Sequence, residues 1–195
     1  MRVDLEIVGQ LIKPKSRILD LGCGEGDLLH FAKMKKQATG FGLDNDPNNI
    51  QTCLEKGVNV IEQDLDSGLT NFDDNSFDLV IMTETLQAVS KPEQLMKEML
   101  RVGKECIVTI PNFGQIFCRL NLFFSGKMPV AKHLPHNWYD TPNIHLCTLN
   151  DFEELCRKLE VKILTRNLFD QYFQPNKFLT IAPNLFCYHA YYHLK

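Results

Sequence analysis

Short apolar runs alternate with amphipathic segments along the first 112 residues. Residues 17–22 and 77–84 are apolar runs, and the first ends in glycine, which is typical of a buried strand. Between such runs, apolar residues return every three or four positions, as on one face of a helix. The chain therefore predicts strands over 17–22, 40–44, 58–64, 77–84 and 105–112, and helices over 4–12, 27–35, 46–57 and 90–100.

This alternation predicts the fold class. Strands joined through helices run parallel and are connected by right-handed crossovers, which gives a doubly wound α/β sandwich. Such sheets bind ligands at the carboxyl ends of their strands, near the point where the strand order reverses. The residues that directly follow each strand are therefore the candidates for chemistry.

The second half of the chain has a different pattern. Only four of the nineteen aromatic residues precede position 113, and segment 113–147 has no clean period and is rich in Phe, Pro and His. We expect it to be an insertion of loops and short helices within one domain over 1–195. A capping box of Asn150 and Glu153 predicts a helix through Leu159, and 161–169 and 185–194 are expected to be closing strands.

Composition narrows the classes of function. With 44% apolar and 23% charged residues the chain is globular, and a net charge of −3 argues against a nucleic-acid partner. Seven cysteines without a C-x-x-C pair indicate a reducing compartment. Residues 1–17 include acids where a signal peptide would be purely apolar. No apolar run approaches the roughly 18 residues of a membrane span. We therefore expect a cytoplasmic protein without a membrane segment.

A glycine-rich loop follows the first predicted strand. It reads Asp20-Leu-Gly22-Cys23-Gly24-Glu-Gly26, which is G-x-G-x-G after an aspartate and not the dinucleotide pattern G-x-G-x-x-G. Glycines allow a sharp turn and the close approach of the backbone to a ligand. An aspartate beside the loop suits a cation better than a phosphate. The loop therefore favours S-adenosylmethionine (SAM), which brings an ammonium group and a sulfonium cation.

An acid also ends the second predicted strand. Asp44 lies eighteen residues after Gly26, close to the spacing of about 20 at which an acid holds ribose hydroxyls. A carboxylate can accept hydrogen bonds from both hydroxyls. Asp46 is expected to cap the following helix, which leaves Asp44 free for this role. We predict that Asp44 and its neighbour Asn45 contact the cofactor.

The third and fourth predicted strands end in further polar residues. Asp64 can accept from the exocyclic amine of adenine, with Leu65 against the ring. Thr83 and Glu84 stand where the amino-acid end of the cofactor or an acceptor would lie. By position, these four residues complete the predicted cofactor site.

The other clusters of polar and aromatic residues carry weaker signals. His133, His136, His145 and Cys147 fit no zinc spacing, so no metal is expected. A histidine among them is a candidate base for an acidic acceptor, without a choice among the three. Segment 116–124 is a candidate membrane-surface helix, although a substrate lid, a partner surface or a cover for the sheet fits its aromatics better.

The glycine loop and the strand-end acids resemble a class I SAM-dependent methyltransferase over residues 17–112. The chain is more narrowly similar to the methionine biosynthesis protein MetW family, through RILDLGCGEGDLL (17–29), PNFG (111–114), GKMPV (126–130) and NWYDTPNIHLCTLNDFEELC (137–156). The resemblance implies a seven-stranded, mostly parallel sheet whose last hairpin is antiparallel. It also implies a link to homoserine O-acyltransferase.

Three functional hypotheses remain open. The chain is a methyltransferase for a small molecule, a SAM-sensing subunit of the acyltransferase, or a partner that has lost SAM binding. The intact glycines and acids weigh against the third. We expect a SAM-binding, methyltransferase-like protein that acts with homoserine O-acyltransferase. Docking is expected through 113–147, whose candidate contact residues are Phe117, Arg119, Phe123, Phe124, Trp138 and Tyr139.

Overall fold

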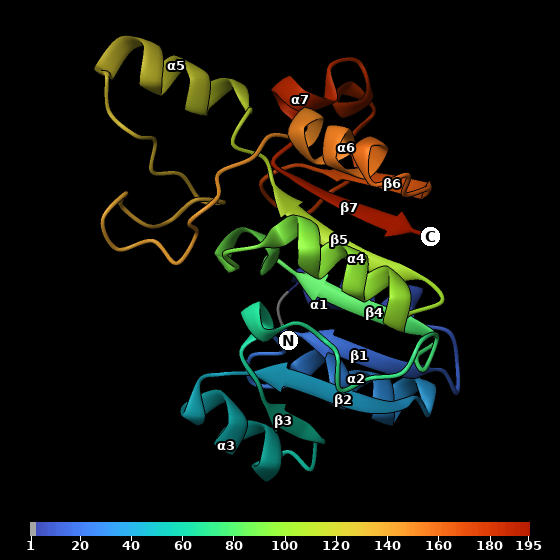
Figure 1. Cartoon of the computed structure of the whole chain (residues 1–195). Coiled ribbons are helices and arrows are strands. Elements are labelled where there is room, and N and C mark those ends of the chain that lie inside the picture. Colours follow the sequence, from blue (N-terminus) through green and yellow to red (C-terminus); the bar gives the residue numbers. More distant parts are fainter. Residues whose placement is uncertain (1–2) are drawn as a thin grey trace.

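A seven-stranded sheet runs through the middle of the molecule, in the order β3-β2-β1-β4-β5-β7-β6 (Figure 1). The computed structural model describes residues 3–195. Strands β1 to β5 are parallel to one another, and β7 is antiparallel to both β5 and β6. The strands are β1 (Arg17–Leu21), β2 (Thr39–Asp44), β3 (Val60–Glu62), β4 (Leu79–Thr83), β5 (Cys106–Pro111), β6 (Ile163–Phe169) and β7 (His189–Leu194).

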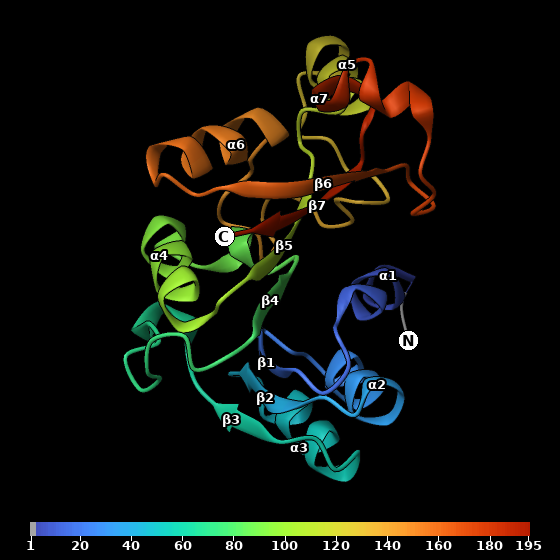
Figure 2. The same cartoon turned by 90° about the vertical axis from the view of Figure 1, so that its right-hand side faces the viewer.

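Helices cover both faces of the sheet. Figure 2 shows the sheet nearly edge-on, with α4 and α6 on one side and α1, α2 and α3 on the other. Their bounds are α1 (Val3–Leu11), α2 (Asp27–Lys36), α3 (Pro47–Glu55), α4 (Pro92–Val102), α5 (Ile116–Ser125), α6 (Leu149–Lys158) and α7 (Pro183–Phe186). Three 3₁₀ turns complete the chain, η1 (Leu65–Ser67), η2 (Leu86–Ala88) and η3 (Lys177–Thr180).

Strands β1, β4, β5 and β7 each contribute to two hydrophobic cores, because successive side chains point to opposite faces. Val80 of β4 joins the core that contains Met96 of α4 and Phe152 of α6. Its neighbour Ile81 joins the core that contains Val8 of α1 and Leu28 of α2. Burial on both sides explains why these strands are continuous apolar runs in the sequence. The predicted doubly wound, mostly parallel sheet with an antiparallel last hairpin is confirmed.

The strand order reverses between β1 and β4. Both neighbours of β1 are parallel to it, so the loops after β1 and β4 leave the same edge of the sheet and diverge. A crevice opens at this edge in sheets of this kind. The antiparallel strand β7 starts here too, since its first residue His189 pairs with Pro111 at the end of β5.

The predicted capping box of Asn150 and Glu153 is wrong by two residues. Helix α6 begins at Leu149, and its N-cap is Thr148. The Thr148 hydroxyl accepts from the backbone N–H of Asp151 at 3.3 Å, and the Asp151 carboxylate accepts from the N–H of Thr148 at 2.8 Å. A threonine hydroxyl with an acid three residues on satisfies two orphan donors, which fixes the earlier start.

Two strand predictions are too long by four residues each. The third strand covers only Val60–Glu62, within the predicted 58–64. The last strand begins at His189 and not at 185, because Pro183 starts the short helix α7. Proline favours the first position of a helix, where its missing N–H costs nothing. The predicted cap of α3 is confirmed, since the Asp46 carboxylate accepts from the backbone N–H of Asn48 at 2.8 Å.

The segment 113–147 contains one regular element, α5, and is otherwise irregular. Figure 1 shows α5 and the chain that follows it standing away from the sheet. Its aromatic side chains are largely exposed, with Phe123 at 80% and Trp138 at 75%. A helix with this many exposed rings does not serve mainly to cover the sheet.

Candidate functional site

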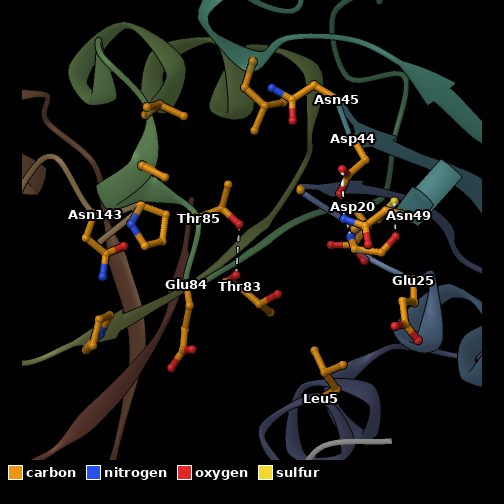
Figure 3. Close-up of a pocket in the computed structure, with 18 of the residues that line it drawn as sticks. Leu5, Asp20, Glu25, Asp44, Asn45, Asn49, Thr83, Glu84, Thr85 and Asn143 are labelled. Atoms are coloured by element: carbon orange, nitrogen blue, oxygen red, sulfur yellow. Dashed lines mark hydrogen bonds between the residues drawn. The ribbon is translucent and has the colours of Figure 1, made fainter. Parts of the chain in front are cut away.

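A cavity of about 970 Å³ lies at the edge of the sheet where the parallel strands end. Figure 3 shows side chains from the loops after several strands pointing toward it. Ten of the eleven residues predicted to bind the cofactor line this one cavity. They are Asp20, Gly22, Cys23, Gly24, Asp44, Asn45, Asp64, Leu65, Thr83 and Glu84.

The eleventh residue, Gly26, packs inside the fold. A Cβ at this position would lie 2.8 Å from the Cys53 sulfur and 3.3 Å from a methyl carbon of Val58. Gly26 therefore permits α2 to start close to α3 and β3. Its role in the loop is tight packing, which is one of the roles that glycines play in such turns.

Gly24 has the opposite environment. Its φ of +52° is in the left-handed region, and a Cβ there would meet no atom of residues 3–195 within 4 Å. The position is open because it borders the cavity. Here the backbone itself is the surface that a ligand approaches.

Asp44 ties the glycine loop to the second strand. Its Oδ2 accepts from the N–H of Gly24 at 2.8 Å, and its Oδ1 accepts from the N–H of Asp46 at 2.9 Å and the amide of Asn49 at 3.2 Å. Two carboxylate oxygens offer about four lone-pair sites, so the side chain keeps room for ligand hydroxyls. Asn49 also lines the cavity.

Asp20 is a buried acid at the floor of the site. It is 2% exposed, and within the described chain its Oδ1 has no hydrogen-bond partner. Burial, and to a smaller extent the charge of Asp44, raise the pKa of the Asp20 carboxyl to about 7. An unpaired buried carboxylate is costly. A cation in the cavity would offset this cost.

Hydrogen bonds to two aspartate side chains fix the loop after β3. The Asp64 carboxylate accepts from the N–H of Asp66 at 2.9 Å and caps η1, which places Leu65 at the wall of the cavity. The Asp66 carboxylate in turn accepts from the N–H and the hydroxyl of Ser90, both at 2.8 Å. The loops after β3 and β4 are thus joined beside the cavity.

Glu84 stands after β4 in a strained conformation. Its φ is +53°, which a side chain with a Cβ rarely adopts, and such strain often marks functional positions. The hydroxyl of Thr109 accepts from its N–H at 2.9 Å. Its carboxylate lies 3.0 Å from Nδ1 of the buried His189, whose ring stacks on Phe173. Contacts with β5 and β7 thereby hold the turn.

The cavity is acidic. Within the described chain, seven carboxylates line it and no Lys or Arg does. Lys56, which does not line the cavity, pairs with Asp27 at 2.6 Å and with Glu25 at 3.5 Å. Such a site attracts cations and repels phosphates and other anions. The seven are Asp20, Glu25, Asp27, Asp44, Asp64, Asp66 and Glu84.

The three candidate histidines lie in different environments. His133 and His136 line the cavity, whereas His145 does not. His133 is 7% exposed, and burial lowers its pKa to about 4, so its imidazole is neutral at pH 7. Cys118 Sγ lies 3.6 Å from its Nε2. The described residues contain no group of three or more His, Cys, Asp or Glu arranged to hold a metal ion.

Several lining residues were not predicted from the sequence. Leu5 of α1 and Asn49 of α3 border the cavity, and so do Pro142 and Asn143 of the irregular segment. In the sequence, Leu5 is only one of the apolar residues at helical spacing in 4–12. Its place at the site depends on how α1 packs beside the sheet edge, which the spacing of apolar residues does not specify.

Solved structures with this fold include SAM-dependent methyltransferases. The crystal structure of one from Archaeoglobus fulgidus has a TM-score of 0.69 at 16% identity, over 98% of this chain and 94% of that one. Another from Mesorhizobium loti also has a TM-score of 0.69 at 16% identity, over 97% of this chain and 95% of that one. The fold is that of the class I SAM-dependent methyltransferases.

The family is narrower than the fold class. The family model described as methionine biosynthesis protein MetW matches residues 2–194, and the chain belongs to this family. It is 35% identical over 172 residues to the "Bifunctional methionine biosynthesis protein MetXA/MetW" of Rhodopirellula baltica. That alignment covers 84% of this chain and 28% of the relative, so the chain spans less than a third of the relative's length. Within residues 3–195, no helix is long and apolar enough to cross a membrane.

Proposed function

We propose that this protein binds SAM in the acidic cavity and acts in methionine biosynthesis together with homoserine O-acyltransferase in the cytoplasm. The observation that carries SAM binding is the convergence of the glycine loop, Asp20 and Asp44 on one cavity. Asp20, whose Oδ1 has no hydrogen-bond partner among the described residues, and the open backbone at Gly24 suit a cationic ligand that lies against the loop.

Each part of SAM has a candidate partner. Asp20 faces the ammonium and sulfonium charges, and Asp44 accepts from the ribose hydroxyls while it holds Gly24. Asp64 accepts from the adenine amine, and Leu65 packs against the ring. When bound, SAM supplies an electrophilic methyl group. Among the described residues the lining carries no Lys or Arg for a pyrophosphate, which argues against a dinucleotide.

The acyltransferase partnership has two independent supports. One relative carries a MetXA part and a MetW part in a single chain, which keeps the two parts at high effective concentration. The second support is the set of exposed rings on 113–147, such as the perpendicular pairs Phe123–Phe124 and Trp138–Tyr139. Aromatic residues are enriched at the centres of protein interfaces.

An active methyltransferase for a small molecule is the second candidate. The favouring observation is the far wall of the cavity, where the neutral imidazole of His133 and the strained Glu84 lie beyond the glycine loop. Methyl transfer from a sulfonium depends mainly on alignment of the two reactants. For an acceptor with an acidic proton, His133 or His136 would serve as the base.

One experiment separates the two candidates. The chain is purified from its host with its associated proteins, and the sample is incubated with SAM that carries a radiolabelled methyl group. The main proposal predicts that homoserine O-acyltransferase copurifies and that the chain binds SAM. Transfer of label to a small molecule by chain free of the acyltransferase supports the second candidate. Absence of the acyltransferase from every preparation contradicts the partnership.

A further inference from the structure

A second hollow lies directly behind one wall of the SAM cavity. It is a groove of about 400 Å³, which we name the Trp138 groove. Its lining is mostly apolar, and Trp138 itself is exposed. Its apolar lining includes Phe113, Met128, Leu134, Trp138, Ile144 and Leu146.

One stretch of chain, residues 133–143, forms the wall between the cavity and the groove. His133 and Pro135 line the cavity, and Leu134 between them lines the groove. His136 and Asn143 line both. Figure 3 shows Asn143 on the opposite side of the site from Asp44. A ligand on either side of this wall therefore contacts the same two side chains.

The wall is held to the core at its ends. The backbone N–H groups of Ile144 and His145 both donate to the carbonyl of Gln87, at 2.9 and 3.0 Å. Gln87 belongs to η2, and the next residues, Ala88 and Val89, line the SAM cavity. Between these bonds and the buried Leu134, the wall lies at the surface. Segments with few buried contacts are the ones that rearrange at low cost.

We propose that SAM in the cavity and homoserine O-acyltransferase in the Trp138 groove change each other's affinity through the wall 133–143. This inference rests on the proposed function and adds regulation to it. The occupant of the groove is an apolar segment of the acyltransferase, because the fused relative carries a MetXA part beside its MetW part. Whichever ligand binds first orders His136 and Asn143, so the second has less ordering entropy to lose.

Linkage makes the effect reciprocal. If the acyltransferase tightens SAM binding by some factor, SAM tightens acyltransferase binding by the same factor. We expect a factor of at least about five, the lower end of typical allosteric couplings. The amount of SAM thereby changes how tightly the protein binds an enzyme that acts in making methionine. The methyl group and the amino-acid portion of SAM derive from methionine.

The test is a thermodynamic cycle measured by calorimetry. The Kd of SAM is measured for the chain alone and for its complex with the acyltransferase, and the Kd of the acyltransferase is measured with and without saturating SAM. The two ratios are expected to be equal and at least about fivefold. His136→Ala and Asn143→Ala should bring both ratios toward one. His145→Ala is the matched control, because His145 lies next to the wall and lines neither hollow, so its ratios should match wild type.

The outcomes distinguish this inference from the proposed function. If both ligands bind and both ratios equal one, the coupling is wrong and the proposed function stands. If SAM or the acyltransferase fails to bind, the proposed function fails and the inference with it. A self-association of the chain that Trp138→Ala abolishes would show that a second copy fills the groove, which also overturns the inference.

Discussion

The backbone N–H of Gly24 donates a 2.8 Å hydrogen bond to the Asp44 carboxylate. This bond joins the loop after β1 to the end of β2 across the floor of the cavity. The same carboxylate that is expected to hold a ribose therefore also sets the shape of the glycine loop. The Asp44 side chain therefore positions the glycine loop and is also expected to bind the cofactor.

Replacing Asp44 with Ala tests this double role. We expect SAM binding to weaken by about 1.5–3 kcal/mol, the range for hydrogen bonds to a charged group. Calorimetry measures the loss. Asp46→Ala is the control, since it removes the cap of α3 and leaves the cavity lining intact. Equal losses in the two variants would show that Asp44 acts only through stability.

Replacing Gly24 with Val should abolish SAM binding while the fold is retained. The side chain would enter the space that we assign to the cofactor, since no atom of the described residues lies within 4 Å of a Cβ built there. The left-handed φ adds strain, of roughly 1–2 kcal/mol. Gly57→Val carries the same kind of strain at φ +66°, at a residue that does not line the cavity. If Gly24→Val binds SAM as well as Gly57→Val does, the loop is only a turn.

The sequence predicts the site residues at the ends of the strands more completely than those in the irregular segment 113–147. Asp20, Asp44 and Asp64 follow from their places at strand ends, because parallel strands bring those ends together. Asn143 and Pro142 sit in an irregular segment without a period, so nothing local indicated that they face the same cavity. The start of α6 was missed because Thr148 with Asp151 competes with Asn150 as a cap, and only the geometry decides between them.

Asp20 predicts a specific dependence on pH. Its folded pKa of about 7 lies above its ordinary value of 3.8. The native state therefore binds more protons than the unfolded state between these values, and this contribution to stability is lost as the pH rises from about 4 to 7. Thermal unfolding at several pH values measures the slope. Asp20→Asn should remove this loss, and an unchanged slope in the variant would contradict the assignment.

The affinity for SAM should also depend on the ionisation of the Asp20 carboxyl. Only the ionised carboxylate attracts the cation, so SAM binding to the wild type should strengthen between pH 6 and pH 8. In Asp20→Asn the affinity should be weaker and nearly independent of pH over this range. Calorimetry at constant ionic strength separates this effect from screening of the other acids. A parallel pH profile in wild type and variant would point to another acid of the cavity.

The exposed rings of 113–147 should anchor the acyltransferase. Trp138→Ala and Phe123→Ala are each expected to cost on the order of 2 kcal/mol of binding, as central aromatic anchors do. Copurification and a binding isotherm measure the loss. Phe178→Ala is the matched control, because this ring is also exposed but lies on η3 outside the segment.

The alternative role for this segment is a substrate lid. In that case Trp138→Ala and Phe123→Ala should change methyl transfer and leave the complex intact. An undiminished complex in both variants would contradict docking through 113–147.

The most direct test of SAM binding is a calorimetric titration of the purified chain with SAM and, separately, with ATP. SAM should bind one molecule per chain with micromolar affinity, because the acids of the cavity favour its cation. ATP carries the same adenosine and a polyanion, and a lining whose described residues include seven acids and no Lys or Arg should reject it. Absence of heat with both SAM and S-adenosylhomocysteine, or binding of ATP as tight as that of SAM, would contradict the assignment of this cavity.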